Sequence, residues 1–176
     1  MHRIILFRGG MCGDLILGMI DKKYVKSVYP FQHIKGRQRM KKFFEYSDKE
    51  KQEYFENMEG YTLSHDTEFC RNVNPDSVVQ LFCSDKKMMP VLAERFWTKN
   101  DSKDVEHVKS DLTLDKDYTL SDDMQAWQDF HVFKHRFDIK NVYKITFVND
   151  VEKCFGIKDL GWAKTLHKIW LDRELR

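Results

Sequence analysis

The stretch RIILFRGGMCGDLILGMID, residues 3–21, contains the strongest local pattern in this chain. The apolar run in 3–7 predicts a short strand that is buried on both faces, and the apolar spacing over 14–20 predicts a helix. Three glycines lie within the five residues 9–13 that join them. A plain strand-to-helix turn needs one glycine at most. The spacing therefore predicts that the backbone passes close to a ligand or turns where a side chain would clash.

The composition is that of a globular protein. Of 176 residues, 41% are hydrophobic and 14% are aromatic, so we expect one domain over 1–176. The formal net charge is only +2, which predicts no strong attraction to nucleic acid or to a membrane surface. The apolar runs are too short to span a bilayer, and 1–7 is too short for a signal peptide. The four cysteines are scattered without CxxC pairs, which favours reduced thiols and a cytoplasmic location.

Segments with strand and helix patterns alternate along the chain. Strands are predicted over 3–7, 61–66, 78–83 and 142–148. Helices are predicted over 14–20, 36–58, 86–97, 121–137 and 162–172, and the polar residues 98–120 predict a loop. Such alternation is typical of an α/β fold with a parallel central sheet that is flanked by helices on both faces.

Parallel sheets of this kind bind ligands beyond the carboxyl ends of their strands, and the first strand-to-helix turn is a favoured position. A helix N-terminus offers N–H groups and a positive dipole end that suit an anion. Arg8 would add a charged hydrogen bond. The loop has neither the Walker A spacing nor GxGxxG, and Asp14 also suits an ordinary N-cap.

The order of four segments resembles that of the sulfotransferase family, which binds the nucleotide sulfate donor PAPS. RGGM at 8–11 is similar to the family's Lys-Gly-Gly-Thr loop, and LSHD at 63–66 is similar to its strand ending in Thr-His. LFCSDKK at 81–87 stands where the family has Arg-Asn-Pro and a serine that hold the 3′-phosphate. FVNDV at 147–151 is similar to its Tyr-Glu-Asp-Leu ending. The chain has Arg for Lys in the first loop, and it lacks both the Thr of that loop and the 3′-phosphate Arg and Ser.

The resemblance implies a three-layer sandwich of the P-loop NTPase and sulfotransferase type. It implies transfer of a sulfuryl group from PAPS to a hydroxylated acceptor, with Arg8 and His65 as the catalytic residues. His65 would be the general base, since imidazole titrates near neutral pH. No metal is implied. The nucleotide-binding residues would be Arg8, Gly9, Gly10, Met11, Cys12, Gly13, Asp14, Ser84, Lys86 and Lys87.

Other interpretations stay open. His65 could be a polar strand-end residue bonded to Asp66 or to a backbone carbonyl, and the whole chain could be a non-catalytic binding or structural module, including a virion component. The short length would suit a viral genome. A nucleotide-sugar glycosyltransferase is a further enzyme class, but it needs a second nucleotide-binding domain. His131 and His135 lie four apart on a predicted helix, where a solvated face is favoured over a metal site.

Overall fold

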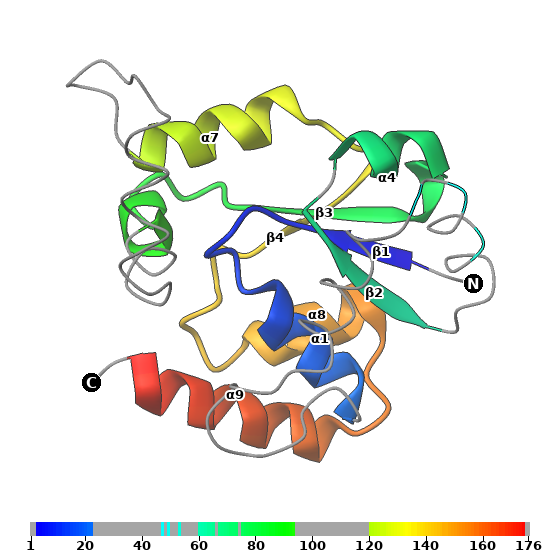
Figure 1. Ribbon diagram of the computed structural model, residues 1–176. Coiled ribbons are helices and arrows are strands. Elements are labelled where there is room, and N and C mark those ends of the chain that lie inside the picture. The colour runs from blue at the N-terminus through cyan, green and yellow to red at the C-terminus, as the bar shows by residue number, and fades with distance from the viewer. Residues whose placement is uncertain are drawn as a thin grey trace.

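The computed structural model describes residues 3–22, 47, 49, 53, 60–65, 67–73, 75–93 and 120–174. Its described strands form one sheet in the order β2-β1-β3-β4, and every pair is parallel (Figure 1). The strands are β1 (Arg3–Leu6), β2 (Tyr61–Ser64), β3 (Val78–Phe82) and β4 (His135–Asp138). The predicted α/β class and the parallel arrangement of the first three strands are confirmed.

The central position of β1 explains its continuous apolar sequence. Ile4 pairs with Thr62 of β2 on one side and with Val78 of β3 on the other. Ile4 and its two successors, Ile5 and Leu6, are completely buried because helices cover both faces of the sheet.

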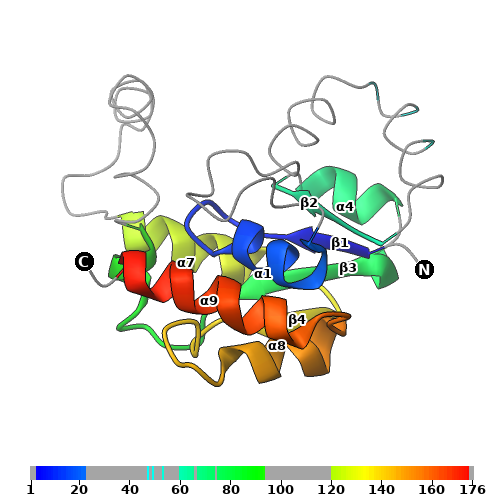
Figure 2. The ribbon, with the colours of Figure 1, turned by 90° about the horizontal axis from the view of Figure 1, so that it is seen from below.

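Helices lie on both faces of the sheet. Figure 1 shows α4 (Thr67–Val73) and α7 (Leu120–Phe130) above it, and α1 (Gly13–Ile20), α8 (Phe147–Phe155) and α9 (Leu160–Glu174) below it. Figure 2 shows the lower layer from the front, with α9 packed along α1. The Trp162 side chain on α9 donates from Nε1 to the Gly18 carbonyl of α1 at 3.0 Å. A short 3-10 turn, η2 (Pro75–Ser77), precedes β3, and residues 89–93 are helical.

The strand predicted over 142–148 is wrong. Residues 140–146 form turns, with backbone bonds from Val142 N to Ile139 O and from Phe147 N to Lys144 O, both 2.9 Å. Helix α8 then begins at Phe147 and buries Phe147, Val148, Val151 and Phe155. That spacing has a helical period, which the β-branched and aromatic residues before it concealed.

Two other element bounds differ from the prediction. The helix predicted over 121–137 ends at Phe130, and its last residues belong to β4, so His131 and His135 do not share a helix. The second strand ends at Ser64, and helix α4 takes up residues 67–73. The helix predicted over 162–172 is confirmed by α9. The predicted helix at 36–58 and loop at 98–120 lie almost wholly outside the described residues.

Candidate functional site

The strand order creates one position where connections diverge. The chain leaves β1 towards β2 on one side, whereas β3 on the other side of β1 continues outward to β4. In open parallel sheets the crevice beyond the carboxyl ends of two such strands is where ligands bind. Here those ends lead into Phe7 and Arg8 after β1 and into Cys83 and Ser84 after β3. The switch point of this sheet therefore lies between two loops that the sequence identified.

The loop after β1 is a tight turn. Met11 N donates to the Arg8 carbonyl at 3.1 Å, and Gly10 has a φ of 88°, which glycine adopts without strain. Cys12 is the N-cap residue of α1 with a φ of 59° and no side-chain capping bond, so Asp14 is not the N-cap but stands in the first turn of the helix. Met11 and Cys12 are buried in the core. The loop therefore turns inward before α1 begins.

Gly13 has a packing reason of its own. A Cβ built on Gly13 would lie 2.5 Å from the Phe7 ring, far inside van der Waals contact. Phe7 is buried against the start of α1. One of the three glycines is thus required by an aromatic side chain, whether or not a ligand binds there.

Arg8 points towards the α7 side of the sheet. Its Nη2 atom lies 2.8 Å from Oδ2 of Asp123 on α7, and the two side chains are 48% and 31% exposed. An exposed pair of this kind is weak, so an anion at the loop can compete with Asp123 for the guanidinium.

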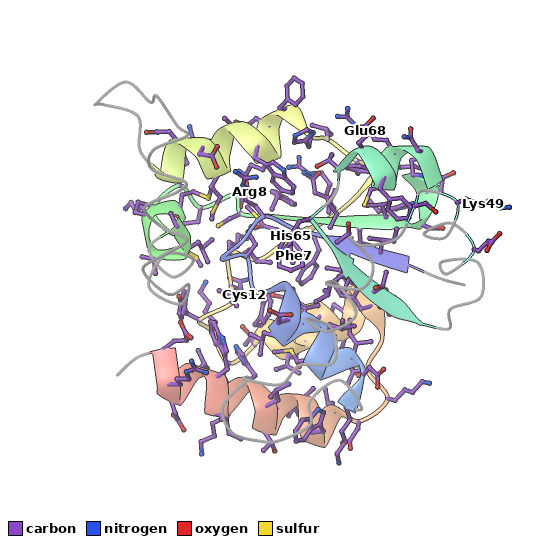
Figure 3. All side chains as sticks on the ribbon, viewed as in Figure 1. Phe7, Arg8, Cys12, Lys49, His65 and Glu68 are labelled. Atoms are coloured by element: carbon purple, nitrogen blue, oxygen red, sulfur yellow. The ribbon has the colours of Figure 1, made fainter. Side chains whose placement is uncertain are left out.

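His65 lies directly beside the first loop (Figure 3). Its Nδ1 atom is 2.5 Å from the Phe7 carbonyl oxygen, and the two rings are 4.2 Å apart between centroids. A carbonyl oxygen only accepts, so Nδ1 carries the proton and the neutral ring has its lone pair on Nε2. That tautomer is the one a general base needs at Nε2. The backbone-carbonyl bond expected of a structural histidine is also present.

The loop after β3 is held by two residues that the sequence analysis did not identify. Ser84 donates from its backbone N and from Oγ to the two carboxylate oxygens of Asp138, at 3.1 and 2.5 Å. Burial alone would raise the pKa of Asp138, but the hydrogen bonds from Ser84 and Lys140 outweigh it and keep the pKa below its ordinary value. Gln128 of α7 bonds both the N–H and the carbonyl of Cys83.

The remaining polar groups of this loop face solvent. Lys86 and Lys87 are exposed, and the Lys87 N–H is bonded by the Asp85 carboxylate at 3.0 Å. Burial raises the pKa of the Cys83 thiol to about 11, so this thiol stays protonated at neutral pH and is no nucleophile. All four cysteines are free thiols, as predicted.

Sequence reasoning thus located three of the loops at this edge but not their supports. Arg8 contacts Asp123, and Ser84 contacts Asp138. The backbone of Cys83, next to Ser84, is bonded by Gln128. The one available signal was Asp138, a carboxylate that ends a short strand, and the helix predicted over 121–137 concealed that strand. In the described part of the chain no group of three His, Cys, Asp or Glu side chains could hold a metal ion.

The comparisons with known proteins leave the family undetermined. No protein-family model matches this chain, and neither a curated protein nor a solved structure matches it significantly. Within the described residues, no helix has the length and apolar character to cross a membrane.

Proposed function

We propose that this chain is a sulfotransferase-like protein that binds a phosphorylated nucleotide at the switch point between β1 and β3 and transfers a sulfuryl group to a hydroxylated acceptor. The observation that carries the proposal is the convergence of Arg8, His65 and the Ser84–Lys87 loop at one edge of the sheet. The order of the first three segments, which resembles that of the sulfotransferases, supports the choice of reaction, whereas the fourth segment, 147–151, begins helix α8 and gives no support. The P-loop-like form of the fold belongs to the same proposal.

Each residue has a distinct part in this proposal. N–H groups at 9–14 bind the donor's 5′-phosphate side, and Arg8 stabilises the charge that develops on the bridging oxygen. Nε2 of His65 takes the acceptor's proton as the acceptor oxygen bonds to sulfur and the bond from sulfur to the bridging oxygen breaks. Lys86 and Lys87 supply positive charge for the nucleotide's remaining phosphate. Asp14, in the first turn of α1, contributes its N–H group to this scheme, and its carboxylate has no role in it.

A second candidate is the non-catalytic module. The observation that favours it is that two of the proposed functional side chains already have partners inside the fold. Arg8 pairs with Asp123, and Ser84 is bonded to Asp138. In this alternative both contacts serve stability alone, and the edge of the sheet binds a nucleotide or a partner without reaction.

Both candidate functions include nucleotide binding at the edge of the sheet, and ligand-binding measurements test it. Thermal shift and calorimetry with PAP, PAPS, ATP and a UDP-sugar measure which class binds, because a ligand of the folded state stabilises it by mass action. FMN belongs in the panel, since doubly wound sheets with the order of the described strands bind its phosphate at the same switch point. A wild type that ignores PAP and PAPS removes the sulfotransferase proposal.

Variants then separate catalysis from binding. Arg8→Ala should weaken PAP binding by about 1.5–3 kcal/mol, the value of a charged hydrogen bond. His65→Ala should leave PAP affinity nearly intact and slow transfer of labelled sulfate from PAPS by roughly 10²–10⁴-fold. His135→Ala, at the opposite end of the sheet, is the matched control and should change neither quantity. A wild type that binds PAP but transfers to none of a panel of hydroxylated acceptors supports the module.

A further inference from the structure

Helix α7 contacts both loops at the switch point of the sheet. Near the start of the helix, the Asp123 carboxylate accepts a hydrogen bond from Nη2 of Arg8, in the loop after β1, at 2.8 Å. Near its end, the Gln128 side chain bonds the backbone of Cys83, which directly follows β3. The Cys83 N–H donates to Oε1 at 2.9 Å, and Nε2 donates to the Cys83 carbonyl at 3.0 Å. One helix therefore bridges the two loops at which the proposed ligand binds.

The two contacts of α7 are not equally firm. Gln128 is buried, and so are Met124 and Trp127, which share its face of the helix because the three residues are spaced at i, i+3 and i+4. This face anchors the helix on the core. Arg8 and Asp123, in contrast, are 48% and 31% exposed, and an ion pair that is so accessible to water adds little to stability. The Asp123 contact can therefore open while the rest of the helix stays in place.

The carboxylate of Asp123 has the same chemistry as an anionic ligand of Arg8. Guanidinium N–H groups bind carboxylate, phosphate and sulfate oxygens alike. Asp123 is also tethered to the site by the fold, so it meets Arg8 at a higher effective concentration than a dilute free anion does. An anion that binds Arg8 either takes the place of this carboxylate or lies beside its negative charge. In both cases Asp123 opposes the binding of the anion.

We propose that Asp123 sets the anion affinity of the candidate site as an internal competitor, which occupies Arg8 in the free protein and is released by an anionic ligand. The ligand group is a phosphate or a sulfate. It accepts hydrogen bonds from Arg8 as the Asp123 carboxylate turns out to solvent, and Gln128 keeps the rest of α7 on the loop after β3. The contact is thus autoinhibitory. The inference rests on the anion site of the proposed function and not on the identity of its nucleotide.

Titrations of the whole chain with PAP and with sodium sulfate test the competition. Asp123→Asn keeps the size of the side chain and removes its charge, so it should strengthen the binding of both ligands about two- to fivefold, the effect of losing an exposed ion pair. Asp122→Asn is the matched control, because it removes the same charge from the exposed neighbouring residue of the same turn, and it should change the affinity less. Urea midpoints confirm that each variant folds.

The opposite sign is expected if Asp123 instead orients Arg8 for the ligand. Asp123→Asn would then weaken binding, and that result would overturn the competitor. An unchanged affinity would overturn it as well. If Asp122→Asn strengthens binding as much as Asp123→Asn does, the effect belongs to the general charge of the turn, and the competitor is also wrong.

The carboxyl ¹³C resonance of Asp123, assigned from Asp123→Asn, reports the release directly. Arg8→Gln gives the position of this resonance without the ion pair. Sulfate should move the wild-type resonance saturably towards that position, and sodium chloride at matched ionic strength is the control, since salt alone screens an exposed pair. A resonance that keeps its paired position while the ligand binds would contradict the release.

The two ligands separate this inference from the proposed function. If sulfate moves the Asp123 resonance but PAP binds neither the wild type nor Asp123→Asn, the competitor is retained and the nucleotide function is wrong. If PAP binds and the Asp123 resonance keeps its paired position, the function is retained and the competitor is wrong. If neither ligand binds either protein, both proposals are wrong.

Discussion

Replacing Gly13 with alanine separates the two reasons for a glycine in the first loop. The new methyl group would lie 2.5–2.7 Å from three carbons of the Phe7 ring, so the ring or the start of α1 must shift by close to an ångström. Overpacking of this kind costs about 1–3 kcal/mol. The higher helix propensity of alanine offsets at most about 1 kcal/mol of this cost, and less in the first turn of a helix. The net loss should be about 1–2 kcal/mol.

Thermal and urea unfolding measure this loss. For a chain of this length about 2–4 °C of melting temperature corresponds to each kcal/mol, so Gly13→Ala should melt about 2–8 °C lower. Gly161→Ala is the matched control, because its Cβ meets only the Asp159 carboxylate at an ordinary 3.5 Å. That variant should be neutral or slightly stabilised.

A double-mutant cycle identifies the cause. Phe7→Leu makes room at Gly13, so Gly13→Ala should cost clearly less in the Phe7→Leu background, with a coupling energy of about 0.5–2 kcal/mol. If Gly13→Ala costs the same in both backgrounds, the packing explanation is wrong. If Gly13→Ala keeps wild-type stability but loses nucleotide binding, the glycine serves the ligand.

Two further predictions concern stability. His167 is buried and donates from Nε2 to the Val142 carbonyl at 2.7 Å, and burial lowers its pKa below the ordinary 6.5. As the pH falls, the imidazole of His167 is therefore protonated in the unfolded chain before it is protonated in the folded one. The contribution of the neutral His167 to stability is complete above pH 6.5 and is lost as the pH falls below that value. Urea midpoints from pH 8 to 5 should fall less steeply for His167→Gln than for the wild type, and equal slopes would contradict the assignment. Asp138→Ala should cost about 0.5–1.5 kcal/mol and speed hydrogen exchange at the Ser84 amide, since the exposed hydroxyl and N–H of Ser84 lose their acceptor. Unchanged exchange at Ser84 would show that Asp138 does not hold the loop.

The sequence predicts correctly those parts of the fold whose local pattern fits only one type of secondary structure. The apolar run at 3–7 has one explanation, a strand buried on both faces, and β1 confirms it. Residues 78–83 are equally unambiguous. The alternation of strands and helices then requires crossovers, and crossovers require parallel pairs.

The fourth strand was missed because tertiary context outweighed propensity. Residues 142–148 are rich in β-branched and aromatic types, which favour a strand. In the structure Lys144, Ile145 and Thr146 are exposed in a row, whereas a strand buried in the sheet would cover all three. The strand found in the structure, His135–Asp138, lies at the edge of the described sheet, where it pairs with β3 alone. This position explains why it is short and polar. Its one buried side chain is Phe137. A four-residue strand with a single inward residue has almost no periodicity to detect.

The difference between local patterns and tertiary contacts also explains which residues of the candidate site the sequence predicts. Arg8, Gly10 and His65 lie in local patterns that end strands, so their placement at one edge followed from the parallel topology. Their partners do not lie in any such pattern. Asp123 lies 115 residues from Arg8 in the sequence, and only the packing of α7 over the sheet brings the two side chains to 2.8 Å. In the proposed function, the Asp123 carboxylate competes with the nucleotide for Arg8, because it already accepts from Nη2 of the guanidinium. The loop sequence alone thus predicts the position of the proposed anion site, whereas the partner of Arg8 is known only from the packing of α7.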